Sequence, residues 1–256
     1  MNIMSNPLKY IFIVPYRDRE PHKVFFQKYM ETILEDYTPE SYLILFVHQK
    51  NKLLFNRGAM KNIGFLYIKE KYPKQYKDMI FIFNDVDTVP YRKGLLNYDV
   101  PFGEIKHFYG YTFALGGIFS IRGKDFEMLQ GFPNYWSWGF EDNVIYKRAV
   151  QKKMKIDRDT FFTIKDISIL HFFDDLHKHI EKNTLDKQFN KSYVESDGLN
   201  HLKQIKYTFN HETNMLDVAS FVSKYPSNNL SMMEYNVSSG SKITKKKRSG
   251  IKMNFF

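Results

Sequence analysis

Three short runs of the chain are apolar or aromatic at every position, and segments with helical periodicity separate them. The runs are 10–14, 42–47 and 79–83. Between them, apolar residues recur every three or four positions over 22–34 and 56–72, which predicts two amphipathic helices. Strands that are apolar on both faces are typical of a sheet covered on both sides. Their alternation with helices predicts an α/β fold.

The second half of the chain has a weaker pattern. We expect a strand at 117–121, a short helix over 124–130 and a longer helix over 141–154, whose acidic first turn and basic end suit the helix dipole. Residues 157–235 favour neither helix nor strand. No internal repeat or linker is visible, so we expect one domain over residues 1–236.

Composition narrows the class of protein. The 256 residues are 43% hydrophobic and 17% aromatic, which indicates a globular chain with a large core. There is no cysteine, which excludes disulfides, Cys-ligated zinc and thiol nucleophiles. The longest apolar runs are far shorter than the roughly 18 residues of a membrane span. Since no signal peptide is visible either, we expect a cytoplasmic protein.

The positive charge is concentrated at the C-terminus. Residues 237–256 contain six Lys and Arg and no Asp or Glu, so they carry +6 of the net charge of +10 and leave +4 for residues 1–236. We expect this segment to be a disordered tail, which either contacts anionic surfaces or only aids solubility. A nucleic-acid partner is not expected, because phosphate binding needs a basic face on the folded part.

Two aspartates follow the third apolar run directly. Asp85 and Asp87, in the sequence DVDTVP, would point the same way from an extended chain. They would lie at the carboxyl end of a strand, where α/β sheets bind ligands. Such a pair can hold a divalent cation, and the cation can hold a diphosphate. The alternative is that one aspartate caps a turn and the other is solvated, since short motifs often match by chance.

Basic residues stand after the first strand and at the start of the second helix. Arg17 and Arg19 belong to PYRDRE, and Asn56 and Arg57 belong to FNRG. Arginines at these places suit a nucleotide phosphate or base. A solvated basic loop is an equal alternative for the first pair, and Asn56 alone fits a helix N-cap.

Both tryptophans of the chain lie in one segment, QGFPNYWSWGFEDN. Trp136 and Trp138 stand two residues apart, and Glu141 and Asp142 follow. The common role of two such acids is to stabilise the first turn of a helix, by up to about 1 kcal/mol. That role does not explain Trp138 and Gly139 directly before them, so a binding or catalytic role is the second interpretation.

Taken in order, these segments resemble the β-1,4-galactosyltransferase family. The chain contains PYRDR, FNRG, DVDTVP, LGG, QGFPNYWSWGFEDN and SDGLN. The family shows P-F-R-x-R, F-N-R-A, D-V-D-x-x-P, F-G-G, N-G-F-x-N-x-[YF]-W-G-W-G-x-E-D-D and S-D-G-L-N in the same order. The resemblance covers roughly residues 10–222. It implies a GT-A fold, which is Rossmann-like with a mixed central sheet flanked by helices.

The same resemblance implies an activity. It is a Mn²⁺-dependent, inverting transfer of a hexose from a UDP-sugar to a hydroxyl of a sugar or glycoconjugate. An inactive relative that only binds sugar or nucleotide is the alternative, and the retained acids Asp85, Asp87, Glu141 and Asp142 argue against it.

Roles for single residues follow from the resemblance as well. The nucleotide-sugar pocket would be lined by Pro15, Tyr16, Arg17, Arg19, Phe55, Arg57, Asp85, Ala114, Gly117 and Trp138. The metal would be bound by Asp87 and His171. The acceptor would be bound by Tyr111, Trp138, Glu141 and Asp142. Asp142 would be the catalytic base, with Glu141 beside it, and Trp138 would lie on a mobile loop over the donor.

The chain departs from the family around the metal and in the tryptophan segment. Ser168 and Phe173 stand where relatives have a further metal ligand, Met or His, so the third ligand stays open. His177 and His179 are substitutes if they are not simply solvated. Ser137 replaces the Gly between the tryptophans, which favours a stiffer loop because Ser allows fewer backbone conformations.

Substrate-binding positions depart too. Ala114 stands where galactose-specific members have a Tyr, and relatives with a smaller residue there accept N-acetylgalactosamine. Galactose and N-acetylgalactosamine are therefore the leading donors. Asn143 replaces the third acid of the E-D-D run. The family's acceptor-pocket aromatic has no clear counterpart around 183–185, which favours an acceptor other than N-acetylglucosamine.

Overall fold

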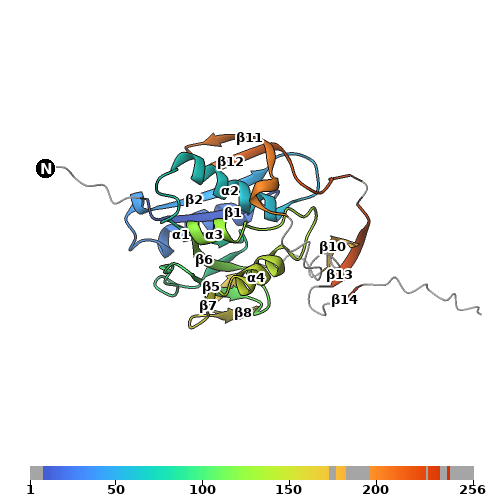
Figure 1. Ribbon diagram of the computed structural model, residues 1–256. Helices are drawn as coiled ribbons and strands as arrows, with labels where there is room; N and C mark the ends of the chain where they lie inside the picture. The colour runs from blue at the N-terminus through green and yellow to red at the C-terminus, as the bar shows by residue number, and fades with distance from the viewer. Residues whose placement is uncertain (1–7, 173–176, 183–196, 229, 237–240, 243–256) are drawn as a thin grey trace, which may run out of the picture.

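A mixed sheet of nine strands forms the centre of the protein. The computed structural model describes residues 8–172, 177–182, 197–228, 230–236 and 241–242 (Figure 1). The strands of the sheet are β1 (Tyr10–Tyr16), β2 (Tyr42–Gln49), β3 (Ile80–Asn84), β5 (Glu104–Gly110), β6 (Ile118–Arg122), β7 (Lys155–Asp157), β8 (Phe162–Thr163), β11 (Lys203–Asn210) and β12 (Met215–Val222). Their order is β11-β12-β2-β1-β3-β6-β5-β7, with β8 beside β5. Neighbouring strands are parallel except where β6 and β11 pair.

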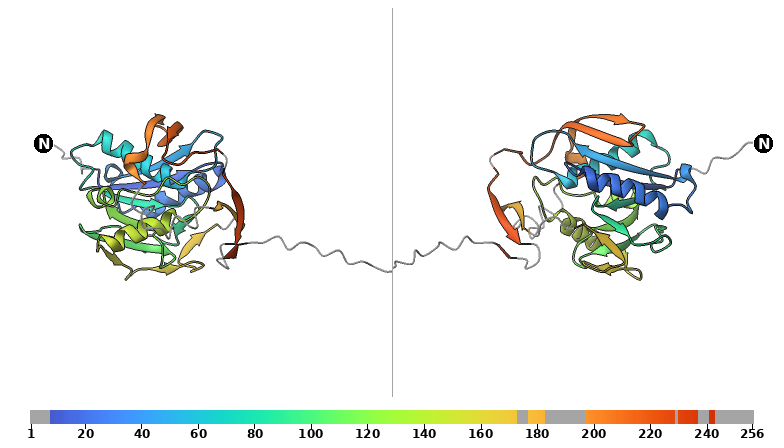
Figure 2. Two further views of the ribbon diagram at one scale, coloured as in Figure 1. Left: turned by 45° about the vertical axis from the view of Figure 1, so that its right-hand side comes forward. Right: turned by 180° about the vertical axis from the view of Figure 1, so that it is seen from behind.

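Helices cover both faces of this sheet. They are α1 (Glu20–Ile33), α2 (Arg57–Lys71), α3 (Gly123–Met128) and α4 (Glu141–Gln151), with short 3-10 turns at Pro39–Ser41 and Leu199–His201. Alternate residues of β1 lie on the two opposite faces of the sheet. Phe12 packs in the cluster that includes Phe26 of α1, whereas Ile13 packs in the cluster that includes Ile63 of α2 and Ile145 of α4. Seen from behind, α1 lies in front of the sheet (Figure 2). The predicted two-sided burial is therefore confirmed.

The predicted elements of the first half are confirmed with one correction. The three apolar runs are β1, β2 and β3, and the two amphipathic segments are α1 and α2. The first strand extends beyond the apolar run 10–14, because β1 continues through Pro15 to Tyr16. Pro15 pairs with Val47 of β2, while the pairing with β3 stops at Ile13 opposite Phe83. Pro15 thus occupies an edge position, which tolerates its missing N–H.

The region without a clear pattern adds strands. β11 and β12 extend the main sheet, and β9 (Ile169–His171) pairs with β4 (Thr88–Pro90). A third sheet consists of β10 (His177–Glu181), β13 (Met232–Asn236) and β14 (Ser241–Lys242). Within the basic tail 237–256, the described residues are those of β14. The rest of the tail lies outside the described residues, so its disorder stays a prediction.

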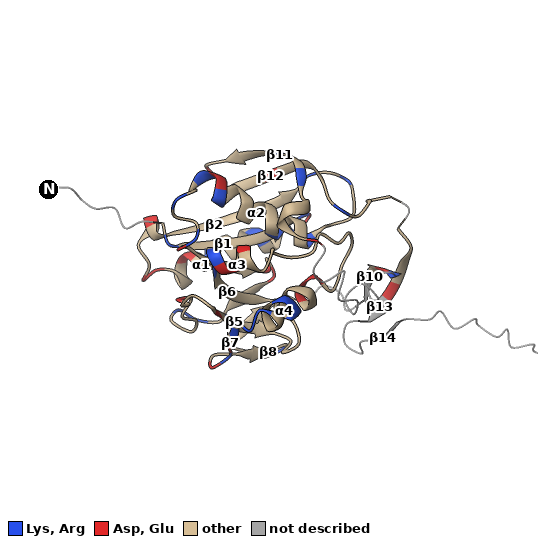
Figure 3. Ribbon diagram, viewed as in Figure 1, with Lys and Arg blue, Asp and Glu red and all other residues tan. Residues whose placement is uncertain are grey.

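The topology brings several polar segments to one end of the sheet. Asp85 follows β3 directly, and the β4–β9 pairing places His171 opposite Thr88. Acidic and basic residues are interspersed along the elements in the view of Figure 3. Among the described residues, we find no helix of the length and apolarity that crossing a membrane requires.

Candidate active site

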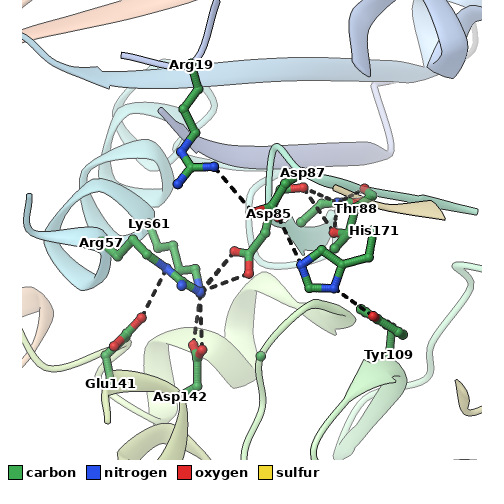
Figure 4. Close-up of polar contacts among 12 residues, drawn as sticks. Arg19, Arg57, Lys61, Asp85, Asp87, Thr88, Tyr109, Glu141, Asp142 and His171 are labelled. Carbon is green, nitrogen blue, oxygen red and sulfur yellow. Dashed lines mark hydrogen bonds and ion pairs between the residues drawn. The ribbon is translucent and has the colours of Figure 1, made fainter. Parts of the chain in front are cut away.

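The segment after β3 is a tight turn. The backbone N–H of Thr88 donates to the carbonyl oxygen of Asp85 at 3.1 Å, and the Asn84 side chain donates to the carbonyl oxygen of Thr88 at 2.8 Å. The expected extended geometry of Asp85 and Asp87 is therefore wrong. Both carboxylates still enter the same site, where they have different partners (Figure 4).

Arg57 connects three carboxylates on one side of this turn. Its Nη2 atom lies 3.0 Å and 3.1 Å from the two carboxylate oxygens of Asp85 and 3.3 Å from Oδ2 of Asp142. Its Nε atom lies 3.1 Å from Oε1 of Glu141, an ion-pair contact without hydrogen-bond geometry. The preceding Asn56 caps α2 by accepting from the Ala59 N–H at 2.9 Å, as the N-cap alternative predicts.

Lys61 contributes a second cation that sequence reasoning missed. Its Nζ atom lies 2.9 Å from Oδ1 of Asp142, 3.9 Å from Asp85 and 4.5 Å from the centre of the Phe132 ring. The residue is 1% exposed. A helical lysine is normally solvated, but the spacing of four residues from Arg57 places both cations on one face of α2.

The cations and the burial act on the acids in opposite directions. Burial would raise the pKa of Asp85, but Arg57 and Lys61 outweigh it and the pKa is lowered. Burial raises the pKa of Asp142 to about 6, with Lys61 opposing the shift and Glu141 adding to it. Burial would lower the pKa of Arg57, but the acids raise it. Asp142 is therefore ionised at neutral pH and close enough to its pKa to take up a proton.

Asp87 and His171 form a pair on the other side of the turn. Nε2 of His171 lies 3.9 Å from Oδ1 of Asp87, and Nη1 of Arg19 lies 3.8 Å from Oδ2 of the same carboxylate. Nδ1 of His171 lies 2.7 Å from the Tyr109 hydroxyl. This contact orients the ring, as the outer partner of a metal-binding histidine does. Burial raises the pKa of Tyr109 to about 12, so its hydroxyl stays protonated.

The pair fits a divalent cation. Carboxylate oxygen and imidazole nitrogen bind such metals at about 2.0–2.2 Å, so two donors 3.9 Å apart can contact one ion. Oxygen and imidazole donors together suit Mn²⁺. Among the described residues, no group of three or more His, Cys, Asp and Glu is arranged for a metal. Phe173 and the side chains of His177 and His179 lie outside the described residues, and Ser168 donates its N–H to Asp166.

The two tryptophans have different surroundings. Trp136 is 4% exposed, stacks on Phe221 at 5.2 Å and donates its indole N–H to the carbonyl oxygen of Tyr225 at 2.9 Å. It is a core residue. Trp138 is half-buried, directly before the acids of α4. Between them, Ser137 has φ +72° and accepts a hydrogen bond from the Glu181 N–H at 3.0 Å. This bond connects the tryptophan segment to β10, and the stiffness of the loop stays a prediction.

The glycine pair lies against the first turn of α4. The Leu115 N–H donates to the Asp142 carbonyl at 2.9 Å. A Cβ atom on Gly116 would come within 2.6 Å of Oδ2 of Asp142, so a larger residue would displace that carboxylate. Gly117 has φ +69°, where a side chain is strained.

Tyr111 and Ala114 lie in the same loop. The Tyr111 ring stacks on Phe113 at 5.2 Å, and Phe113 is 58% exposed. Ala114 is 6% exposed.

The predicted nucleotide residues of the first strand gather at its carboxyl end. The Arg17 guanidinium lies 5.4 Å from the centre of the Phe55 ring and donates to the carbonyl oxygen of Leu53. The buried Tyr16 donates its hydroxyl proton to Glu20 at 2.8 Å. Arg19 lies 3.8 Å from Asp87. The structure therefore brings together these predicted site residues: Arg19, Arg57, Asp85, Asp87, Glu141, Asp142 and His171 (Figure 4).

Asp197 and Gly198 of the SDGLN segment are hydrogen-bonded to Asn134 of the tryptophan segment. Oδ1 of Asp197 accepts from the Asn134 side chain at 2.9 Å, and Oδ2 accepts from the Asn134 backbone at 2.6 Å. The buried Arg148 of α4 donates to the carbonyl oxygens of Gly131, at 2.5 Å, and Asp197. These bonds fix the tryptophan segment against α4.

Comparisons with known proteins agree with this geometry. The family model for the N-terminal region of glycosyl transferase group 7 matches residues 5–97, and the model for the N-terminal domain of galactosyltransferase matches residues 99–172. β-1,4-Galactosyltransferase 1 of Mus musculus is 30% identical over 206 residues, which are 77% of this chain and 50% of that protein. Xylosylprotein 4-beta-galactosyltransferase of Caenorhabditis elegans is 33% identical over 160 residues, 59% of this chain and 53% of that protein. The chain thus spans about half the length of these relatives.

Solved structures show the same fold. The catalytic domain of Drosophila β1,4-galactosyltransferase 7, in complex with xylobiose, matches with a TM-score of 0.65 at 20% identity, over 87% of this chain and 97% of that chain. A mutant of that protein in complex with manganese, UDP-Gal and xylobiose matches with a TM-score of 0.63, at the same identity and coverage. The expected GT-A fold is confirmed. Together with the matched family models and relatives, it shows that the chain belongs to the β-1,4-galactosyltransferase family of glycosyl transferase group 7.

Proposed function

We propose that the protein is a Mn²⁺-dependent, inverting glycosyltransferase that moves a hexose from a UDP-sugar to a hydroxyl of a sugar or glycoconjugate. One observation carries the proposal. A carboxylate with a raised pKa, Asp142, and a histidine–carboxylate pair, His171 and Asp87, lie on two sides of one turn. Relatives named as galactosyltransferases, and a neighbour crystallised with manganese and UDP-Gal, support the substrate class.

Asp142 has the chemistry of the base. As the acceptor oxygen attacks the anomeric carbon, a new C–O bond forms and the bond from that carbon to the diphosphate oxygen breaks. The hydroxyl proton passes to the carboxylate of Asp142, which is ionised above a pH of about 6. Glu141 lies beside it, and Arg57 keeps both acids in place through its shared contacts.

Asp87 and His171 are the residues that would hold the metal. When bound there, the cation would supply positive charge for the diphosphate as UDP leaves. The Tyr109 hydroxyl fixes the ring of His171 so that Nε2 faces Asp87. Trp138, half-buried before the acids, would cover the donor and exclude water from the reaction.

The donor pocket is proposed to accept N-acetylgalactosamine as well as galactose. An N-acetyl group needs more room at the 2-position of the sugar than a hydroxyl does. By its resemblance to the family, Ala114 would face that position with only a methyl group, and its two neighbours have other contacts. Phe113 is exposed and stacks on Tyr111, while Leu115 is buried in the core.

A donor screen tests the proposal. The purified protein is incubated with Mn²⁺, each UDP-sugar in turn and a panel of saccharide acceptors, and both UDP release and the mass of the product are measured. We expect acceptor-dependent release of UDP from UDP-galactose, UDP-N-acetylgalactosamine or both. If no UDP-hexose gives a glycosylated product with any acceptor, the proposed function fails and the binding-only alternative takes its place.

A further inference from the structure

The amine of Lys61 is a fully buried charge within the site. Burying an ammonium group is costly unless a partner offsets its loss of water. The partner with the short contact is Asp142, whose Oδ1 atom lies 2.9 Å from Nζ, whereas Asp85 is 3.9 Å away. The amine of Lys61 lies over the Phe132 ring, 4.5 Å from its centre, and the ring closes the core side of the amine. The charge of Lys61 is therefore directed mainly at one carboxylate.

The two oxygens of Asp142 have different surroundings. Oδ1 faces Lys61 on the core side of the site. Oδ2 faces Gly116 and lies 3.3 Å from Nη2 of Arg57, at hydrogen-bonding distance. There is space beside Oδ2 because residue 116 is a glycine. A Cβ atom at that residue would lie only 2.6 Å from Oδ2. Oδ2 is thus the oxygen on the side away from the buried amine.

We propose that Lys61 is a positioning residue for the base. It holds Oδ1 of Asp142 against the core and so presents Oδ2 to the acceptor hydroxyl. In the transfer step the O–H bond of the acceptor breaks and an O–H bond forms at Oδ2, while Oδ1 keeps its contact with Lys61. This inference rests on the proposed role of Asp142 as the base.

Four charged groups act on Asp142 from the elements around it. Arg57 and Lys61 come from α2, Glu141 from α4, and Asp85 from the turn after β3. The two cations favour the ionised base, and the two anions oppose it. Arg57 is shared among three carboxylates, so it cannot replace the contact of Lys61. Loss of the Lys61 charge should therefore act mainly on the ionisation of Asp142.

The test compares Lys61→Met, which keeps the length of the side chain and removes its charge, with Lys69→Met as the matched control. Lys69 lies on the same helix and pairs with Glu127 away from the site. Calorimetric titration of UDP with Mn²⁺ shows whether each variant is folded. The pH dependence of kcat has an acid limb, in which kcat falls as the pH is lowered. Its midpoint is the pH at which kcat is half of its maximum.

We expect Lys61→Met to bind UDP like the wild type, to lose about tenfold or more in kcat at pH 7, and to shift the acid limb up by about one pH unit or more. An opposite charge within about 4–6 Å moves a carboxyl pKa by roughly 1–3 units. Lys69→Met should match the wild type in all three measurements. A lower kcat with an unmoved acid limb would mean that Lys61 only supports the fold, and would overturn the proposal.

A measurement without metal or turnover gives an independent answer. Carbon-13 NMR titration of the Asp142 carboxyl group, assigned by its loss in Asp142→Asn, should show a higher midpoint in Lys61→Met than in the wild type. An unchanged midpoint overturns the proposal. If Lys61→Met does not bind UDP, Lys61→Gln, which keeps a donor but no charge, is judged by the same criterion. Full activity of Asp142→Asn would instead defeat the proposed function itself.

Discussion

The site has two halves that differ in how their negative charge is balanced. The base half consists of Asp85, Glu141 and Asp142, and each of these acids has a contact of 2.9–3.3 Å with Arg57 or Lys61. The metal half consists of Asp87 and His171, where two ion pairs of the carboxylate with described residues are longer. Arg19 lies 3.8 Å from Asp87, and the imidazole lies 3.9 Å from it.

This difference indicates that the two halves have separate roles. The base half carries its own cations, so its acids keep their geometry without any added ion. The metal half holds its donors at a separation that one divalent cation can bridge. We therefore expect the two halves to fail in different ways when they are altered.

Removing the metal should have the largest effect. EDTA in excess should bring transfer below detection, because charge on the departing diphosphate is then not neutralised. Asp87→Ala and His171→Ala should each raise the Mn²⁺ concentration needed for half-maximal activity. His211→Ala, at an exposed histidine in edge-to-face contact with Phe209, is the control and should behave like the wild type. Full activity in EDTA would remove the metal from the mechanism.

Removing the base should have the next largest effect. Asp142→Asn keeps the shape of the side chain but cannot take up the proton, so kcat should fall about 100-fold or more. Asn143→Asp, at the neighbouring position, changes charge without touching the base and should alter kcat little. Rates are measured by UDP release at saturating donor and acceptor. Transfer by Asp142→Asn at the wild-type rate would show that another group accepts the proton.

Acidification should reduce turnover more gradually. The pKa of Asp142 is raised to about 6, and its ionised form is the active one. As the pH falls through about 6, kcat should therefore decline, approaching about tenfold per pH unit well below the pKa. The profile is measured between pH 5 and 8, with UDP binding followed in parallel to separate loss of nucleotide binding from loss of the base. A flat kcat down to pH 5, with UDP binding intact, would contradict the assignment.

Changing the donor pocket should alter the choice of donor and leave the transfer step itself in place. Ala114→Tyr should lower the use of UDP-N-acetylgalactosamine relative to UDP-galactose, because the ring would fill the space for the N-acetyl group. Such a change in fit corresponds to about 1–3 kcal/mol, or roughly 10–200-fold in kcat/KM. Competition between the two donors measures the ratio directly. An unchanged ratio would mean that residue 114 does not set donor choice.

Three strands of the central sheet could be predicted from the sequence because of their apolar pattern. β1, β2 and β3 are apolar at nearly every position because both faces of the sheet are covered. β11 has the opposite character, with alternating half-buried and exposed residues at the edge of the sheet, and it was missed. β5 was also missed, because Lys106 and His107 interrupt its apolar pattern.

The site was predictable as a set of motifs but not as a charge network. Asp85, Asp87, Glu141 and Asp142 were found because they stand in motifs of a known family. Lys61 was missed because a lysine in a helix gives no signal of burial, and its burial depends on carboxylates from two distant segments. Tyr109 was missed for a similar reason, because its partner His171 lies 62 positions away.

The separate roles of the base half and the metal half are tested most directly by calorimetric titration. UDP is titrated into Asp142→Asn and into Asp87→Ala, with and without Mn²⁺. We predict that Asp142→Asn binds UDP with the same Mn²⁺ dependence as the wild type while its kcat falls about 100-fold or more. Asp87→Ala should lose that dependence. If Asp142→Asn loses Mn²⁺-dependent UDP binding, or if Asp87→Ala retains it, the two halves are not separate and the account is contradicted.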